Sequence, residues 1–187
     1  SKVLILAGEK GIGKTTIAGM LATSVIAYQQ LDHAEDAIRS IAYQIAANIP
    51  EYRKRLMALK PDRNRNATAL FHRLLKPLST IRYQGPRQVI LLDGVDKCDS
   101  DMIACIRDHF GELPDWLGVF LTTRPVPRVL KPLRKYDLFV VEADSDDNKA
   151  DIIRYLEDQL GDRAPVKIPL LLEKCKGVFQ QAEEMVR

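Results

Sequence analysis

Five short apolar runs, rich in β-branched residues, recur along the chain and predict five buried strands. They are residues 3–7, 25–31, 89–92, 119–122 and 138–141. Within most of these runs, apolar residues follow one another instead of alternating with polar ones, which is typical of strands covered on both faces. Parallel strands joined by helices have this environment. The pattern therefore predicts a parallel sheet between layers of helices.

The segments between the runs predict helices, because apolar residues recur there at spacings of three and four. This periodicity covers residues 34–49, 67–81 and 146–160, and a shorter helix is expected from an N-cap at Asp101 to Phe110. Alternation of strands and helices defines an α/β fold. After Asp144 only helical patterns occur. We therefore expect an α/β unit over residues 1–144 and a small all-helical unit over residues 145–187.

The connection between the first predicted helix and the second predicted strand is unusually short. A helix from Lys14 and a strand from Val25 leave almost nothing to join Ser24 to Val25. Helix-to-strand connections usually take about 2–6 residues. We therefore expect this junction to be discontinuous in the natural chain.

The composition limits which cellular compartment and which binding partners we expect. The chain has 187 residues, and its net charge of +3 is too small to indicate nucleic-acid binding. Basic residues do gather between Arg53 and Arg65, but with little aromatic interleaving they are better explained as a solvated helix face. No apolar run approaches the roughly 20 residues of a transmembrane segment, and no signal peptide is apparent. The odd number of cysteines favours free thiols. We expect a cytoplasmic protein.

The strongest chemical signal is a complete match to the pattern G-x-x-x-x-G-K-[ST] between the first apolar run and a helical segment. The matching residues are Gly8, Glu9, Lys10, Gly11, Ile12, Gly13, Lys14 and Thr15, and Thr16 follows them. In such a loop, backbone N–H groups wrap phosphates at the N-terminus of a helix. Lys14 would reach the β- and γ-phosphates, and Thr15 would offer its hydroxyl to Mg²⁺. All nine residues are predicted to bind nucleotide.

Charged residues follow two other predicted strands. Asp93 ends a buried strand, where a Walker-B carboxylate would hold Mg²⁺ or its water, although it could instead cap a turn. Asp96 could orient an attacking water or be a solvated loop carboxylate. Arg124 follows the fourth run, at the strand end where ligands bind in parallel sheets. Its guanidinium could contact a γ-phosphate, or it could be an ordinary surface arginine.

The P-loop, the segment 92–96 (Leu-Asp-Gly-Val-Asp) and the segment 121–125 (Leu-Thr-Thr-Arg-Pro) together resemble the NACHT-type signal-transduction ATPases of the STAND class. This family includes innate-immune receptors and scaffold proteins. The resemblance implies a P-loop NTPase fold with a five-stranded parallel sheet in the order 2-3-1-4-5, flanked by helices and followed by a helical lid. It implies ATP or ADP with Mg²⁺ held by Thr15 and Asp93, and Lys14, Asp96 and Arg124 as catalytic residues.

The same resemblance implies a molecular switch within a larger protein. Bound ADP would hold a closed form, and exchange for ATP would open the protein for self-association, with effector or repeat domains flanking this chain. Two positions depart from the family pattern. Lys97 stands where the family usually has a glutamate that assists hydrolysis, so hydrolysis is expected to be slow. The segment 177–179 (Gly-Val-Phe) takes the place of a Gly-x-Pro segment near the adenine, and lacks the proline.

Other functions fit parts of the sequence. A catalytically degenerate scaffold module would also carry Lys97, and a small-molecule kinase would share the P-loop. The kinase usually needs an arginine-rich lid, whereas the helical unit here begins with acidic residues. Residues 148–151 (Asn-Lys-Ala-Asp) match a guanine-specificity pattern, but they do not follow a strand directly and read as the first turn of a helix. Adenine is therefore the expected base.

Overall fold

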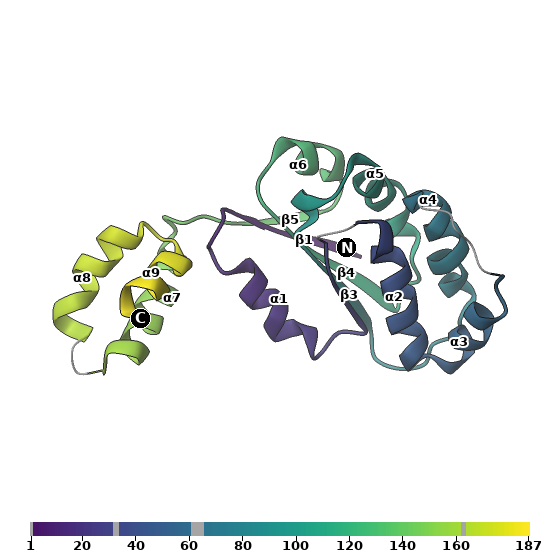
Figure 1. Cartoon of the computed structure of the whole chain (residues 1–187), viewed down its shortest axis with the longest axis horizontal. Coiled ribbons are helices and arrows are strands. Elements are labelled where there is room, and N and C mark those ends of the chain that lie inside the picture. The colour runs from purple at the N-terminus through teal and green to yellow at the C-terminus, as the bar shows by residue number, and fades with distance from the viewer. Residues whose placement is uncertain (1, 32–33, 61–65, 162–163) are drawn as a thin grey trace.

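The computed structural model describes residues 2–31, 34–60, 66–161 and 164–187. One parallel sheet lies at the centre of residues 2–141 (Figure 1). Its five strands are β1 (Val3–Gly8), β2 (Ala27–Gln30), β3 (Gln88–Asp93), β4 (Leu117–Thr123) and β5 (Asp137–Val141). The predicted five-stranded parallel sheet is confirmed, and each apolar run supplies one strand.

The strand order is β2-β3-β4-β1-β5. Relative to the expected order 2-3-1-4-5, the positions of β1 and β4 are exchanged. Val3 pairs with Val119 across β1 and β4, and Leu92 pairs with Leu121 across β3 and β4. Strand order is set by contacts between segments far apart in the sequence, which a local apolar pattern does not encode. The observed order places the end of β4 between the end of β3 and the loop after β1.

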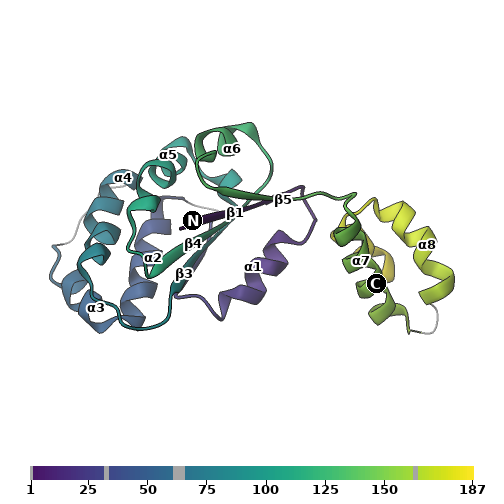
Figure 2. The ribbon, with the colours of Figure 1, turned by 180° about the vertical axis from the view of Figure 1, so that it is seen from behind.

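Helices cover the two faces of the sheet unequally. On one face lie α2 (Ala34–Asn48), α3 (Pro50–Met57), α4 (Ala67–Leu70), α5 (Ser100–His109) and α6 (Pro127–Leu133). On the other face lies α1 (Lys14–Ala22), as Figures 1 and 2 show from opposite sides. Side chains alternate accordingly along β1: Val3 and Ile5 are buried in the main core, whereas Leu4 and Leu6 are only partly buried.

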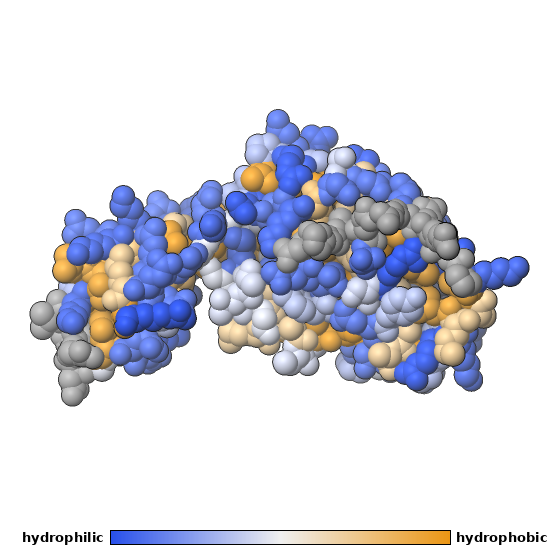
Figure 3. All heavy atoms as spheres, viewed as in Figure 1, coloured by the Kyte–Doolittle hydropathy of each residue, from blue (hydrophilic) through white to orange (hydrophobic). Residues whose placement is uncertain are grey.

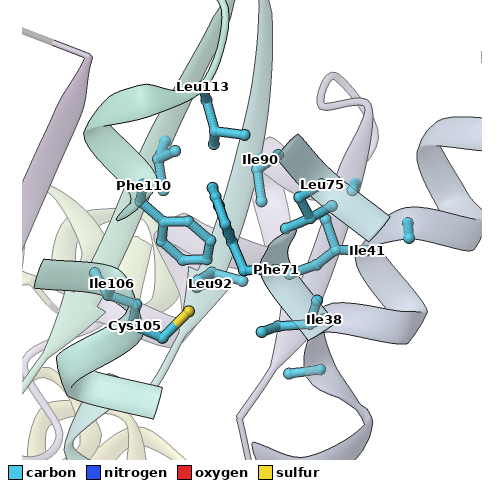
Figure 4. Close-up of a cluster of buried hydrophobic side chains, with 14 of the residues drawn as sticks. Ile38, Ile41, Phe71, Leu75, Ile90, Leu92, Cys105, Ile106, Phe110 and Leu113 are labelled. Carbon is cyan, nitrogen blue, oxygen red and sulfur yellow. The ribbon is translucent and has the colours of Figure 1, made fainter. Parts of the chain in front are cut away.

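The main core lies between the sheet and helices α2 to α6 (Figure 4). Phe71 and Phe110 are fully buried there, with their ring centroids 5.5 Å apart in an edge-to-face arrangement. Ile90 and Leu92 of β3 reach the same cluster, together with Ile38 of α2. The apolar positions that recur along the sequence therefore supply the side chains of this core.

The segment 67–81 does not form the single α-helix that its periodicity predicts. It begins as α4, continues as a π-helical turn η1 (Phe71–Leu75), and ends as a 3₁₀ turn η2 (Lys76–Thr80). Pro77 explains the change, because proline lacks an N–H donor and its ring clashes with the carbonyl four residues earlier in an α-helix. Two further 3₁₀ turns are η3 (Val95–Lys97) and η4 (Phe110–Glu112).

The N-cap of α5 is Asp99, not Asp101. The Asp99 carboxylate accepts a hydrogen bond from the Met102 N–H at 2.8 Å. The Asp101 carboxylate instead accepts the Ala67 N–H at 2.8 Å and so caps a neighbouring segment. Both aspartates precede the same apolar residues, and only the tertiary contact distinguishes their roles.

The connection between α1 and β2 is of ordinary length, because α1 ends at Ala22 and β2 begins only at Ala27. The Ser24 N–H donates to the Leu21 carbonyl, and the Ile26 N–H donates to the Val89 carbonyl. The expected discontinuity rested on a strand that begins at Val25, so it loses its basis.

The described residues after 145 form three helices: α7 (Asp146–Leu160), α8 (Ala164–Cys175) and α9 (Phe179–Val186). They share a separate apolar cluster around Ile152, Leu156 and Cys175, and Figure 3 shows this helical unit beside the sheet-containing part. The predicted boundary near residue 144 falls in the link between β5 and α7. The three cysteines are free and buried. None of the helices in the described ranges is long and apolar enough to span a membrane.

Candidate functional site

The loop between β1 and α1 has the strand-loop-helix arrangement that the motif requires. Gly11 and Gly13 have φ values of 83° and 98°, a region that residues with a Cβ rarely adopt. Gly13 caps α1 without a side-chain hydrogen bond, so the first N–H groups of the helix remain available as donors to an anion. Thr15 and Thr16 are exposed in the first turn of α1, whereas Ile12 of the loop is buried.

Lys14 lies folded back along this loop. Its Nζ donates to the Gly8 carbonyl at 2.7 Å and to the Glu9 carbonyl at 2.8 Å. Burial lowers the pKa of Lys14 from its ordinary value, and Arg124 acts in the same direction. Asp96 and Asp93 oppose this by favouring the charged form. These electrostatic effects show that the structure brings Lys14, Asp93, Asp96 and Arg124 into one neighbourhood.

Asp93 is fixed in place at the end of β3. It is only 2% exposed, and its Oδ1 accepts a hydrogen bond from the Thr122 hydroxyl of the neighbouring strand β4. The Thr122 Oγ1 in turn accepts the Gly94 N–H at 3.0 Å. The carboxylate orientation is therefore set by β4. The sequence did not identify Thr122 as a supporting residue, although Thr122 is a polar side chain inside an apolar strand and belongs to the segment 121–125 that carries the resemblance.

Asp96 and Arg124 form a two-point contact. The Arg124 backbone N–H donates to Asp96 Oδ1 at 3.0 Å, and the Arg124 Nε lies 3.0 Å from Oδ2. The Asp96 side chain is only 10% exposed, whereas that of Arg124 is 47% exposed. Arg128 supports the same turn by donating from Nη1 to the Cys98 carbonyl at 2.9 Å. Both carboxylate oxygens of Asp96 therefore hold Arg124 in the structure.

The helical unit touches the P-loop directly. The Gln180 N–H at the start of α9 donates to the Gly11 carbonyl at 3.0 Å. A Cβ on Gly11 would lie 2.8 Å from Val178 Cγ1, so only glycine permits this approach. The turn before α9 lies even closer to the link after β5: a Cβ on Gly177 would lie 1.8 Å from the Ala143 carbonyl oxygen.

Asn148 connects the turn before α9 to the link after β5 through two hydrogen bonds. The side chain is 5% exposed, and its Nδ2 donates to the Ala143 carbonyl at 2.9 Å and to the Gly177 carbonyl at 2.8 Å. The residue lies in the first turn of α7, whose N-cap is Ser145, as the helical interpretation of residues 148–151 predicts. Since the Asn148 amide is committed to two backbone carbonyls, it does not offer guanine the contact that the sequence pattern suggests.

Two cavities adjoin the P-loop. One, of about 540 Å³, lies between the loop and the helical unit and is lined by Lys14 and Thr15 on one side and Tyr155 on the other. The second, of about 400 Å³, is more apolar and includes Ile12 and Val141. Phe179 lines both cavities. A cavity that contains two lysines of the P-loop thus adjoins a more apolar one, which suits a ligand with an anionic end and a flat apolar end.

A Mg²⁺ ion would need few protein ligands here. Within the described ranges, no group of three or more His, Cys, Asp or Glu residues could hold a metal by itself. Mg²⁺ usually takes one or two protein oxygens and completes its shell with water and substrate phosphates. An exposed Thr15 hydroxyl and an oriented Asp93 carboxylate fit that mode.

Comparison with solved structures identifies the class of fold. The chain is similar to a signal transduction ATPase with numerous domains (STAND) that has a tetratricopeptide repeat sensor, from Pyrococcus horikoshii. The TM-score is 0.61 at 15% sequence identity, and the match covers 95% of this chain but only 26% of that one. The fold is therefore that of a STAND-type P-loop ATPase, and the resemblance noted in the sequence is confirmed at the level of fold.

Comparison of sequences identifies the family. Residues 1–124 match the family model described as nephrocystin 3, N-terminal, and the chain belongs to this family. No curated protein matches the sequence. The matched residues contain the P-loop, Asp93, Asp96 and Arg124, and they end before the helical unit.

Replacing Asn148 by Asp should loosen the helical unit while the sheet remains intact. The variant keeps the side-chain shape but removes both donors and places a charge against two carbonyl oxygens. We expect a local loss of about 1–3 kcal/mol and faster amide hydrogen exchange in α9 and in the turn before it. Asn48→Asp, at an exposed position on α2, is the matched control. Unchanged exchange in α9 of the Asn148 variant would show that the two hydrogen bonds are dispensable.

Proposed function

We propose that this chain is an ATP/ADP-binding switch module with slow hydrolysis, which controls signalling or assembly of a larger protein. The observation that carries the proposal is the direct contact between the P-loop and α9, from the Gln180 N–H to the Gly11 carbonyl. A change in the loop on nucleotide binding would act on the helical unit through this contact. The STAND-type fold supports the class of function.

The phosphates would lie at the N-terminus of α1. Lys14 Nζ, now bonded to two loop carbonyls, would exchange them for β- and γ-phosphate oxygens, which form stronger, charge-assisted hydrogen bonds. Thr15 and Asp93 would hold Mg²⁺, which when bound neutralises phosphate charge. The exposed residues Glu9, Lys10 and Thr16 would border the phosphate path.

The base would occupy the apolar cavity beside Ile12, Val141 and Phe179. Phe179 offers a ring face for stacking at the position where the NACHT-type family, which the sequence resembles, usually has proline. We propose adenine because the Asn148 amide, the one feature that suggested guanine, already bonds two carbonyls. Asp147 and Asp151 also line this cavity and could accept a hydrogen bond from an exocyclic amine.

Arg124 would distinguish ATP from ADP. Its side chain is bonded to Asp96 and half exposed, so a γ-phosphate could compete with Asp96 for the guanidinium. ADP lacks the group that competes. A ligand shifts an equilibrium only through a difference in contacts between two states, and this exchange of partners would provide such a difference. Self-association of the ATP form and flanking effector or repeat domains are further parts of this proposal.

Hydrolysis would be slow because Asp96, the carboxylate proposed to orient water, is engaged by Arg124. Asp96 Oδ1 accepts the Arg124 backbone N–H, and Oδ2 forms an ion pair with the Arg124 guanidinium. Lys97 follows Asp96, with its aliphatic stem lying over Gly94. A charged lysine cannot accept a proton. The water-orienting role of Asp96 would require release of Arg124 first. A degenerate scaffold that binds nucleotide without turnover is the alternative that Lys97 favours.

Replacing Lys14 by Ala tests nucleotide binding. We expect the affinity for fluorescent mant-ADP and mant-ATP with Mg²⁺ to fall by about 100-fold, because hydrogen bonds to charged groups contribute about 1.5–3 kcal/mol each. Lys54→Ala, which removes an exposed lysine from α3 and lies outside the nucleotide site, should bind within about twofold of the wild type, since a surface charge is screened. Mant-GDP should bind the wild-type protein more weakly than mant-ADP. Equal binding by Lys14→Ala and the wild type, or no binding by either, would refute the proposal.

Replacing Lys97 by Glu tests the account of slow hydrolysis. The variant supplies a carboxylate where related proteins have one, and a positioned general base usually contributes about 10²–10⁴-fold. We expect single-turnover release of phosphate from ATP to rise by about tenfold or more. Lys97→Gln removes the charge without adding a base and should stay near the wild-type rate. If Lys97→Glu left turnover unchanged, Lys97 would not be the limiting residue.

A further inference from the structure

A third cavity of comparable size lies far from the P-loop, beyond the β2 edge of the sheet. It has a volume of about 600 Å³ and is formed by α2, α3 and the turn η1. In Figure 1 these elements lie at the end of the molecule opposite the helical unit. None of the nucleotide-site residues named above lines it. We call this cavity the α2–α3 groove.

The floor and one wall of the α2–α3 groove are apolar and open to solvent. Met57 is 79% exposed, Tyr43 is 64% exposed and Leu59 is 40% exposed, and Leu56 and Leu74 lie deeper. Figure 3 shows orange and pale-orange spheres next to blue ones at this end of the molecule. Exposed large apolar side chains that line one concave surface are typical of a binding groove.

The rim of the groove is cationic. Arg39, Arg53, Lys60 and Arg73 line it, and the described lining residues include no Asp or Glu. The Arg53 guanidinium is held in place by backbone carbonyls: its Nε donates to the Ala46 carbonyl at 2.9 Å, and its Nη2 to the Ala47 carbonyl at 2.5 Å. Since carbonyl groups do not neutralise the guanidinium, Arg53 presents a fixed positive charge beside an apolar surface.

The irregular helix at 71–75 shapes the groove. The π-helical turn η1 places Arg73 and Leu74 on its wall. The buried Tyr52 hydroxyl of α3 donates to the Leu74 carbonyl at 2.6 Å and so holds α3 against this turn. Such π-helical turns occur frequently at functional sites. The walls of the groove are therefore fixed relative to each other by a buried hydrogen bond.

We propose that the α2–α3 groove binds an acidic amphipathic helix of a partner protein. The apolar face of that helix would cover Tyr43, Met57 and Leu59, and its flanking carboxylates would meet the cationic rim. Helix-in-groove recognition combines these two elements. The groove is concave, so a helix fills it better than a flat membrane surface does. The opposite charges would also orient the approaching partner.

The test uses the full chain and two fluorescein-labelled synthetic helices, each about 18 residues long because shorter helices are marginally stable in water. Both carry the same stripe of leucines; glutamates flank the stripe in one and lysines in the other. Fluorescence anisotropy at low salt should show that the glutamate helix binds about tenfold tighter than the lysine helix, and that added salt reduces the difference.

Three variants test whether the glutamate helix binds in the α2–α3 groove. Met57→Asp and Arg73→Glu should each weaken binding of the glutamate helix by about tenfold. Arg134→Glu, an exposed charge reversal at the end of α6, should leave it unchanged. Because Met57 is largely exposed, its replacement does not disturb the core.

Four results of the binding measurements would overturn the proposal. These are equal binding of the two helices, no binding of either, binding insensitive to both groove variants, and tighter groove-dependent binding to phosphatidylserine vesicles than to the glutamate helix. A concentration-dependent dimer that Met57→Asp dissociates would assign the groove to a second copy of this chain and would equally overturn it.

Discussion

The turn between α8 and α9 is the constraint on which the rest of the candidate site depends. It approaches the P-loop at Gly11 and the link after β5 at Ala143, so closely that a Cβ on Gly177 would overlap the Ala143 carbonyl. Gly11 and Gly177 both have positive φ, and both lose the contact if they gain a side chain. Asn148 then secures the turn with two buried hydrogen bonds. This junction therefore connects the helical unit to the P-loop in addition to the covalent link after β5.

The charges around Lys14 depend on the order of the strands. Because β4 lies between β3 and β1, the ends of three strands meet: Asp93 from β3, Thr122 and Arg124 from β4, and the P-loop from β1. Opposite charges then pair within the site, with Asp96 holding Arg124. A pair that is only partly buried is weak enough to be exchanged for a phosphate contact. This balance suits a switch better than a rigid catalytic centre.

The sequence predicts those parts of the site that are local in the chain. The P-loop fixes its own geometry through adjacent residues, and Asp93 follows directly from the apolar strand before it. The strand order, the Thr122 support of Asp93 and the role of Asn148 were not predictable in this way. Each depends on a partner at least 28 residues away, such as the Gly177 carbonyl for Asn148. The π-helical turn at 71–75 likewise departs from the local pattern, because Pro77 interrupts the α-helix. The capping roles of Asp99 and Asp101 differ only because Asp101 contacts Ala67 of a distant segment.

In the proposed switch, nucleotide identity controls the position of the helical unit relative to the sheet. The most direct measurement is the spin-label distance between Lys131→Cys on α6 and Glu173→Cys on α8, both exposed positions. The native thiols are buried, and burial raises the pKa of Cys98 and Cys105 to about 12, so they should label poorly. We expect different distance distributions with Mg²⁺–ADP and with a non-hydrolysable ATP analogue. Identical distributions at saturating concentrations of the two nucleotides would contradict the proposed switch.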